Sequence, residues 1–285
     1  MGREENIKIF QDTERLVKEK AILTDTVRYS TKNQILIPEY MQVADMMSKI
    51  ECKGTQHIAQ ANVLVSTKRT YEAASAYKGK KVCVHNFASA TNPGGGVTKG
   101  SSAQEECLCR CSTLYFNLNT SDMWAGFYSP HRNVQDPLHN DDCIYTPNVT
   151  VFKTDTAEPK LMPEADWYQV NVITCAAPNL RLMPSNAMNS VDGMKQVKLA
   201  DKDLYNLHVK RLSRIMEVAV ASGNEVVVLG AFGCGAFENN PEVVARASKE
   251  VVSKYADCFE VIEFAIYCSP RDEQNYKIFK RILGV

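Results

Sequence analysis

Apolar residues follow two patterns along the chain, short continuous runs and longer stretches with one apolar face. The runs are rich in Val, Ile and Leu, as in buried strands, while apolar residues three to four positions apart indicate helices that face a core. Strands are expected at 34–38, 62–66, 81–87, 143–153, 168–176, 225–229 and 260–268. Helices are expected at 3–21, 39–50, 67–77, 103–117, 201–222, 241–255 and 271–283.

Strands and helices alternate from residue 61 onward, which predicts an α/β fold whose sheet is covered by helices on both faces. The apolar run 226–229 belongs in the middle of that sheet. We expect residues 1–60 to form a helical extension packed on a core of residues 61–285. The polar segments 126–142 and 183–198 are expected to be long loops.

Two glycine-rich segments follow predicted strands, and ligands of α/β folds bind beyond the carboxyl ends of strands. The first contains Asn92, Gly94, Gly95 and Gly96, and glycine lets a sugar or phosphate approach the backbone. Lys99 stands where both the Walker loop and the dinucleotide fingerprint require glycine, so neither motif is present. A flexible surface turn is the alternative for this segment.

Gln104, Glu105 and Glu106 follow at the start of a predicted helix. Neighbouring residues on a helix point about 100° apart. The two carboxylates are therefore not expected to flank one glycosidic bond as a symmetric acid–base pair. Without a catalytic role, both acids would simply be favoured by the positive end of the helix dipole.

The second glycine-rich segment contains Gly233, Cys234, Gly235, Ala236 and Phe237. A loop between a strand and a helix directs several backbone N–H groups at one point, which suits a diphosphate. Phe237 and the nearby aromatic side chain at 232 would stack on a ribose or base, or else serve as core residues of a tight turn.

Charge and cysteine content narrow the class of protein. The chain has 285 residues, with 33 Lys and Arg against 33 Asp and Glu, so its formal net charge is zero. Broad non-specific binding to nucleic acid or to an anionic membrane surface is not expected. No secretory signal or membrane-spanning run is recognisable, so a reducing cytoplasmic location is expected, with the 10 cysteines free.

No metal or cofactor is expected from the spacing of cysteine and histidine. Cys107, Cys109 and Cys111 are spaced by two, and only the outer two would share a helix face. Buried thiols explain them better than a metal site. His208 lies on the apolar stripe of its helix and is expected in the core, while His131 and His139 fall in a predicted loop without an assigned role.

The three glycines at 94–96, a spacer of seven residues and then Gln-Glu-Glu at 104–106 resemble the signature of poly(ADP-ribose) glycohydrolases. The sequences around both glycine-rich segments resemble the microbial branch of that family. The resemblance implies a macrodomain-like three-layer α/β/α fold with a mixed central sheet and a cleft for ADP-ribose. Poly(ADP-ribose), free ADP-ribose and ADP-ribosylated proteins are the implied partners.

The same resemblance implies a role for each residue. Glu106 matches the catalytic glutamate, and Glu105 the neighbour that holds ribose hydroxyls. Asn92 and the 94–96 loop would border the ribose beside the scissile bond, with Gln104 nearby. Residues 233–236 would hold the diphosphate and Phe237 would pack on the distal ribose, with Cys107 the one departure, since a small hydroxyl residue is expected there.

The implied activity is hydrolysis of ribose–ribose O-glycosidic bonds from chain ends, with a glutamate as general acid and base. For this, Glu106 should begin protonated, so burial is expected to raise its pKa. Two alternatives stay open at this stage: a module that binds ADP-ribose without cleaving it, and a hydrolase of single ADP-ribosyl modifications.

Overall fold

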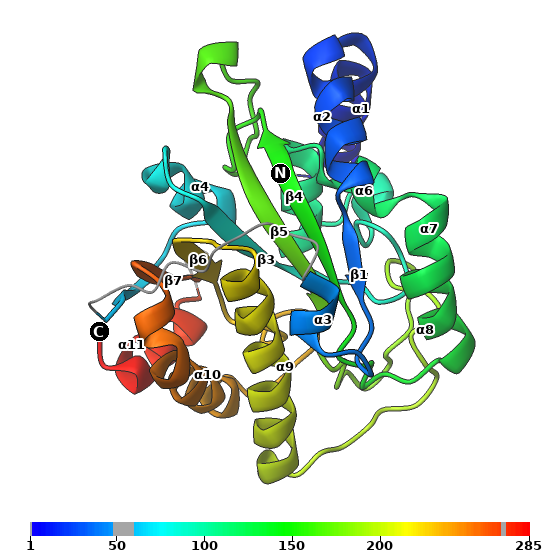
Figure 1. The fold of residues 1–285 in the computed structure, drawn as a ribbon. Helices are drawn as coiled ribbons and strands as arrows, with labels where there is room; N and C mark the ends of the chain where they lie inside the picture. The colour runs from blue at the N-terminus through cyan, green and yellow to red at the C-terminus, as the bar shows by residue number, and fades with distance from the viewer. Residues whose placement is uncertain (1, 48–59, 269–271) are drawn as a thin grey trace.

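The computed structural model describes residues 2–47, 60–268 and 272–285. Within them, seven strands form one sheet (Figure 1). The strands are β1 Ile35–Ile37, β2 Asn62–Ser66, β3 Val82–Ala88, β4 Cys143–Val151, β5 Tyr168–Ala176, β6 Val226–Leu229 and β7 Val261–Ala265. Every strand expected from the sequence is present. Two are shorter than expected at their carboxyl ends, β7 by three residues and β4 by two.

The strand order is β1-β4-β5-β3-β6-β7-β2. Strand β4 runs antiparallel to both of its neighbours, and the other four pairings are parallel. The mixed α/β sheet predicted above is thereby confirmed. β1 belongs to the segment expected to be an extension, yet it pairs with β4 at the edge of the same sheet.

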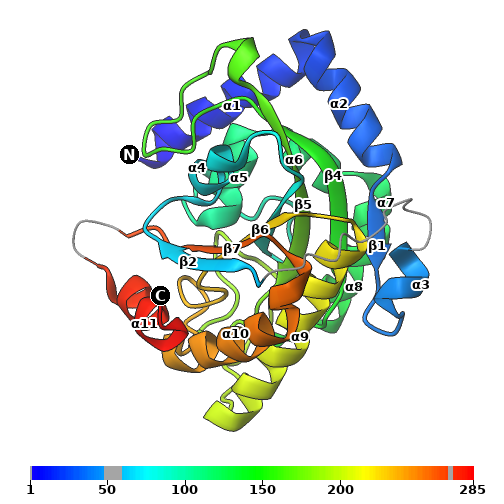
Figure 2. The same ribbon diagram turned by 60° about the vertical axis from the view of Figure 1, so that its left-hand side comes forward.

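Helices cover both faces of the sheet (Figure 2). On one face lie α3 Val43–Met47, α9 Asp201–Ala221, α10 Pro241–Tyr255 and α11 Gln274–Leu283. On the other lie α1 Arg3–Glu19, α4 Thr70–Ala74, α5 Gln104–Cys111, α6 Leu114–Leu118 and α7 Ser121–Met123. Helix α2 Ala21–Lys32 packs with the end of α1 in a smaller separate cluster, and α8 is Ser129–Val134. Alternate residues of the central strands point to opposite faces, as in Val82 and Val84 on one side and Cys83 on the other.

The segment 126–142, expected to be one long loop, is helical over its first half. A π-helical turn, Trp124–Tyr128, continues directly into α8. Phe127, Tyr128 and His131 are buried at helical spacing, and this apolar face was hidden among polar residues. Burial against the core therefore outweighed the composition of the segment.

Several expected helices are shorter or interrupted. The first breaks at Lys20, beyond which α2 is an additional helix that the sequence analysis did not separate. The stretch 103–117 breaks at Ser112, whose extended backbone forms a bridge with Val151. The stretch 67–77 is α-helical only as α4 and ends in a 3-10 turn, and α11 begins at Gln274. Of the helix expected at 39–50, the structure describes α3, and residues 48–50 lie outside the described residues. Residue 271, the expected start of the last helix, also lies outside them.

The sheet brings the two glycine-rich segments to the same edge. β3 and β6 are parallel neighbours, so the loops that leave their carboxyl ends start side by side. β7 ends at the same edge, next to β6. The strand order, which the sequence does not state, thus places both loops at one cleft.

Helix α1 braces the segment between the first glycine loop and α5. Asn6 Nδ2 donates to the carbonyl oxygen of Gly100 (3.0 Å), and Thr13 Oγ1 to that of Arg110 (2.6 Å). Both bonds are buried. The N-terminal helix is therefore part of the support of the candidate site, while a domain boundary at residue 60 stays a prediction.

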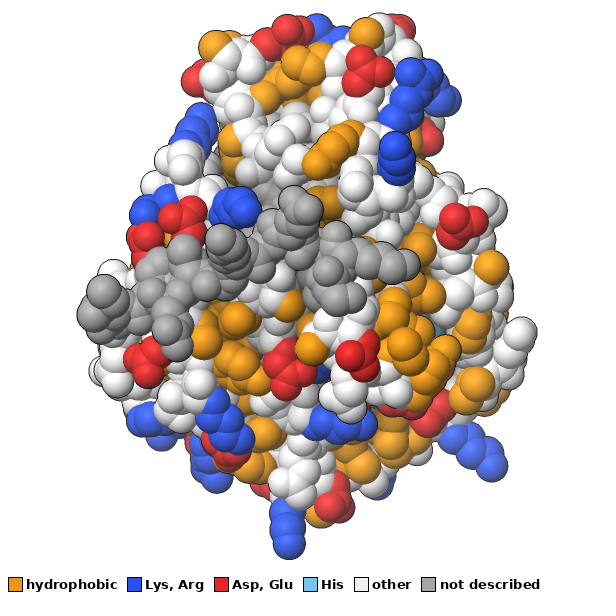
Figure 3. Space-filling model, viewed as in Figure 1, with side chains coloured by type: hydrophobic (Ala, Val, Ile, Leu, Met, Phe, Trp, Pro, Cys, Tyr) orange, Lys and Arg blue, Asp and Glu red, His pale blue; other side chains and the backbone are white. Residues whose placement is uncertain are grey.

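The surface in Figure 3 shows Lys and Arg interspersed with Asp and Glu, without a patch of a single sign on this face. This distribution agrees with the zero formal net charge. In the part of the chain that the structure describes, no helix is both long and apolar enough to cross a membrane.

Candidate active site

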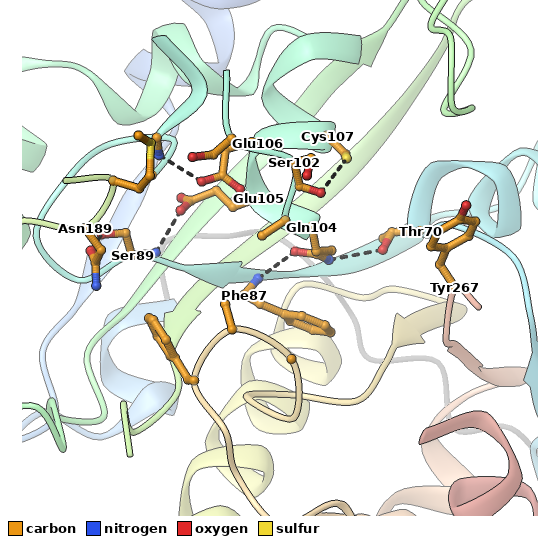
Figure 4. Close-up of a pocket in the computed structure, with 18 of the residues that line it drawn as sticks. Thr70, Phe87, Ser89, Ser102, Gln104, Glu105, Glu106, Cys107, Asn189 and Tyr267 are labelled. Carbon is orange, nitrogen blue, oxygen red and sulfur yellow. Dashed lines mark hydrogen bonds between the residues drawn. The ribbon is translucent and has the colours of Figure 1, made fainter. Parts of the chain in front are cut away.

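A cavity of about 730 Å³ opens at the carboxyl edge of the sheet. Figure 4 shows the start of α5 on one side of it and the second glycine-rich loop below. The residues that line the cavity include Glu105, Glu106, Phe87, Phe237 and Arg69. The volume is within the usual range of small-molecule sites.

Gln104 ties the first turn of α5 to strand β3. Its Oε1 accepts the N–H of Phe87 (2.9 Å), and its Nε2 donates to the carbonyl oxygen of His85 (2.7 Å) and to Thr70 Oγ1 (3.1 Å). The side chain thus substitutes for a strand partner and fixes the helix start over the sheet. Gln104 also lines the cavity (Figure 4).

Glu105 is almost fully buried and is held by two donors from the end of β3. Its Oε2 accepts the Ser89 N–H (2.7 Å) and its Oε1 accepts Asn86 Nδ2 (3.2 Å). Burial, and next the charge of Glu106, raise the pKa of Glu105 to about 8, although both hydrogen bonds oppose the change.

Glu106 is held on one oxygen only. Oε1 accepts the backbone N–H of Gly96 (2.8 Å), whereas Oε2 has no hydrogen-bond partner among the described residues. Burial raises its pKa, against the opposing effects of the Gly96 N–H and the Arg110 charge. The direction expected for Glu106 is thereby confirmed, and two adjacent buried carboxyl groups with raised pKa values retain at least one proton near neutral pH.

The first glycine loop passes directly over both carboxyl groups. Gly95 has φ +59°, and a Cβ at this position would lie 2.5 Å from Glu106 Oε1 and 3.2 Å from Glu105 Oε2. Although neighbouring helix residues point about 100° apart, the two side chains converge on this one backbone position. Only glycine fits both the conformation and the space.

The second loop lines the cavity through a tightly fixed turn. Gly233 has φ +77°, and an added Cβ would lie 2.8 Å from the side chains of Ala177 and Asn239. Asn239 Nδ2 donates to the carbonyl oxygens of Gly233 and Phe237, both at 3.1 Å, which fixes the turn. No hydrogen bond within the described part of the chain uses the N–H groups of residues 235–237.

Most of the site residues expected from the sequence line one cavity. They are Gly95, Gly96, Gln104, Glu105, Glu106, Gly233, Gly235, Ala236 and Phe237. Asn92, Gly94 and Cys234 stand behind this lining. Asn92 Oδ1 accepts from Arg132 (3.1 Å), and Gly94 packs on Tyr115.

Several lining residues were not found from the sequence. Ser89 and Asn189 lie beside Glu105 (Figure 4), and Arg69 and Tyr267 form the opposite end, with the guanidinium 3.9 Å from the ring centroid. Asn189 comes from the irregular 183–198 segment, which has no periodicity to identify it. In the structure Arg69 lies shortly after β2 and Tyr267 shortly after β7, whereas the sequence analysis placed Arg69 in the helix 67–77 and Tyr267 in the strand 260–268. Their position beyond the carboxyl ends of strands was therefore hidden by the expected bounds of those elements.

Cys109, Cys111 and His208 are buried, as expected from the sequence. Cys109 and Cys111 are buried and free, and Cys107, half-buried, lines the cavity. His208 is buried and its Nε2 bonds to Asn239 Oδ1 (2.8 Å). No group of three or more His, Cys, Asp or Glu among the described residues is placed to hold a metal ion.

Fold and site together define a class: an α/β protein with two glycine-rich loops over a buried glutamate pair. The family described as "Microbial-type PARG, catalytic domain" matches residues 4–154, more than half of the chain. The chain therefore belongs to the microbial-type poly(ADP-ribose) glycohydrolase (PARG) family.

Solved structures agree over nearly the full length. The chain is similar to poly(ADP-ribose) glycohydrolase from Thermomonospora curvata, with TM-score 0.79, 26% identity, and coverage of 98% of this chain and 99% of that one. It is also similar to the enzyme from Deinococcus radiodurans in complex with ADP-ribose, with TM-score 0.74, 28% identity, and coverage of 90% and 97%. No curated protein gives a significant match.

Proposed function

We propose that the chain hydrolyses the ribose–ribose O-glycosidic bonds of poly(ADP-ribose) from chain ends, with Glu106 as general acid and then general base. One observation carries the assignment to Glu106. Its Oε1 is fixed by the Gly96 N–H, Glu106 lines the cavity, and the buried Oε2 has no hydrogen-bond partner among the described residues. A carboxyl held in this way is oriented by one oxygen and keeps the other free of hydrogen bonds for the leaving group.

Both glutamates have raised pKa values, so either one could in principle donate the proton to the substrate. Glu105 has a strongly raised pKa, so the proton belongs to the pair rather than to one residue. Both oxygens of Glu105 already accept hydrogen bonds from Asn86 and Ser89. Delivery of the proton therefore falls to Glu106, and Glu105 positions the ribose hydroxyls.

The reaction follows from this arrangement. Glu106 protonates the leaving 2′-oxygen as the bond from the anomeric carbon breaks, and positive charge develops on the sugar ring. The resulting Glu106 carboxylate then takes a proton from the water that attacks this carbon. The ring charge is stabilised by the anionic pair and by the substrate's own diphosphate.

Binding would use the second loop. The unused N–H groups of residues 235–237 suit the oxygens of a diphosphate, and Phe237 would pack on the distal ribose. Holding the sugar between this loop and Gly95 supplies the positioning that an acid–base group alone does not. Asn92 and Gly94 support the first loop from behind.

Parallel assays on two substrates test this function. Wild-type protein is incubated with free poly(ADP-ribose) and, separately, with a protein carrying single ADP-ribose units, and the products are separated by chromatography. We expect monomeric ADP-ribose from the polymer at the earliest times, and no release from the singly modified protein. Binding of ADP-ribose without polymer cleavage, or release from the singly modified protein alone, would overturn the proposal.

A further inference from the structure

A buried histidine–aspartate pair lies behind the cavity. The side chains of His139 and Asp192 are 1% and 0% exposed. His139 Nε2 is 2.7 Å from Asp192 Oδ1, and Nδ1 is 2.7 Å from the carbonyl oxygen of Ala177. Both partners are acceptors when the carboxyl is ionised, so both ring nitrogens must donate, which only the imidazolium form does.

The state of Asp192 supports this reading. Burial alone would raise its pKa, but the hydrogen bond and charge of His139, together with amide donors from Asn179 and Asn189, lower it below the usual value. The pair is thus a buried ion pair whose remaining carboxylate oxygen is also bonded. Loss of either partner would leave a buried charge uncompensated.

The carboxylate of Asp192 fixes the orientation of Asn189. Oδ2 accepts Asn189 Nδ2 (2.8 Å), so the amide oxygen of Asn189 must point the other way. That oxygen accepts the hydroxyls of Ser89 (2.8 Å) and Thr91 (3.3 Å). Ser89 is also the residue whose N–H holds Glu105.

The segment that carries Asn189 and Asp192 has a strained backbone. Val191, between them, has φ +66°, a conformation that β-branched residues rarely adopt. Such a conformation persists only where surrounding contacts over-determine it. Here the side chains of Asn189 and Asp192 are each fixed by hydrogen bonds.

The same pair borders the second loop. The rings of His139 and Phe237 are 6.0 Å apart between centroids. The carbonyl that His139 binds belongs to Ala177, whose Cβ packs against Gly233. One ion pair therefore supports both walls of the cavity, the end of β3 and the second loop.

We propose that the His139–Asp192 ion pair is a positioning device for the glycoside cleavage, acting through Asn189 and Ser89 on Glu105. The inference rests on the proposed function of the cavity. Neither residue of the pair lines the cavity, so both act through others.

Single substitutions test the pair against a matched control. His139→Gln and Asp192→Asn are compared with His131→Gln, another buried histidine, whose ring bonds to Phe127 and Asn140. The His131 ring packs edge to face on that of His139 at 6.1 Å between centroids, so this control shares the surroundings of the pair but not its hydrogen bonds. We expect kcat for ADP-ribose release to fall about tenfold or more in the first two, and KM and ADP-ribose Kd to change by a smaller factor than kcat. His131→Gln should lose thermal stability comparably while keeping kcat within about twofold of wild type. Equal losses of kcat in all three, or an unchanged kcat in Asp192→Asn, would overturn the proposal.

A double-mutant cycle tests the route through Ser89. Ser89→Ala removes the hydroxyl bond to Asn189 and leaves the N–H to Glu105 in place. If Asp192 acts through Ser89, the double variant with Asp192→Asn should be no slower than the slower single variant. Additive losses would contradict the route.

Nitrogen NMR of the His139 ring gives a readout that needs no variant to fold. Both ring nitrogens face acceptors, so each should carry a hydrogen-bonded proton, and a ring with a single N–H would contradict the ion pair. The outcomes also separate the two proposals. If wild type releases no ADP-ribose, the proposed function fails; if wild type is active and the variants match it, only the positioning role fails.

Discussion

Two adjacent carboxyl groups share one buried environment at the centre of the site. Gln104 bonds to strand β3, Glu105 bonds to the residue that follows this strand, and Glu106 bonds to the first glycine loop. The sequence indicates this cluster because three polar residues open a helix behind a glycine run. It does not indicate Asn189, which reaches the cluster only through tertiary folding.

The raised pKa of Glu105 makes stability depend on pH. In the folded protein the pKa of Glu105 is raised to about 8 from its usual 4.5, so the Glu105–Glu106 pair keeps a proton up to about pH 8. The folded state therefore binds more protons, and the free energy of unfolding should fall as pH rises through this window, by at most about 1.4 kcal/mol per pH unit.

Urea unfolding at intervals from pH 6.5 to 8 measures this slope. The lower limit avoids His85 and His208, whose pKa values are lowered to about 3 and about 4 and which make stability rise with pH up to 6.5. Glu105→Gln should flatten the profile, and Glu242→Gln, at a partly exposed glutamate paired with Arg246 and Arg281, should not. An equal slope in wild type and Glu105→Gln would contradict the assignment.

At the scale of elements, the strand–loop–helix segment 82–111 depends on backbone geometry as much as on side chains. Its strand and helix start were predictable from a mostly apolar run and a polar helix opening. The break at Ser112 and the π-helical turn at 124–128 were not, because sheet pairing and burial decide them. Local sequence gives the elements, and packing sets their ends.

Gly95→Ala should reduce activity far more than its loss of stability explains, because it disturbs the contact between the glycine loop and the two carboxyl groups. A methyl group there meets Glu106 Oε1 and Glu105 Oε2, so both carboxyls must shift, and we expect activity to fall about 10²-fold. Gly79→Ala is the matched control, since Gly79 has φ +92° and open space around it. Both variants should lose stability by about 1–2 kcal/mol. Retained activity in Gly95→Ala would contradict the close approach.

At the scale of the whole molecule, the N-terminal segment and the glycine loop form one packed unit. Phe10, 1% exposed, meets Tyr115 edge to face at 4.9 Å between centroids. Tyr115 in turn lies against Gly94. The amphipathic pattern predicted the first helix, but neither its partner nor the edge position of β1 follows from local sequence, because both are long-range contacts.

Phe10→Ala should therefore affect both stability and catalysis. Loss of a fully buried ring costs about 3–5 kcal/mol, and the looser Tyr115 should reduce activity even well below the unfolding temperature. Ile22→Ala, at a position 56% exposed on α2, should change stability by less than about 0.5 kcal/mol and leave activity intact. Comparable effects of the two substitutions, in thermal unfolding and ADP-ribose release, would argue against this coupling.

Delivery of the proton by Glu106 is the step on which the proposed function depends. Its most direct test compares Glu106→Gln with Glu242→Gln, which alters another first-turn glutamate, on α10 and outside the cavity. Release of ADP-ribose from poly(ADP-ribose) and binding of ADP-ribose are measured on both variants. Glu106→Gln should lose about 10²- to 10⁴-fold in kcat and still bind ADP-ribose, while Glu242→Gln matches wild type. Hydrolysis by Glu106→Gln at a rate near that of wild type would contradict the account.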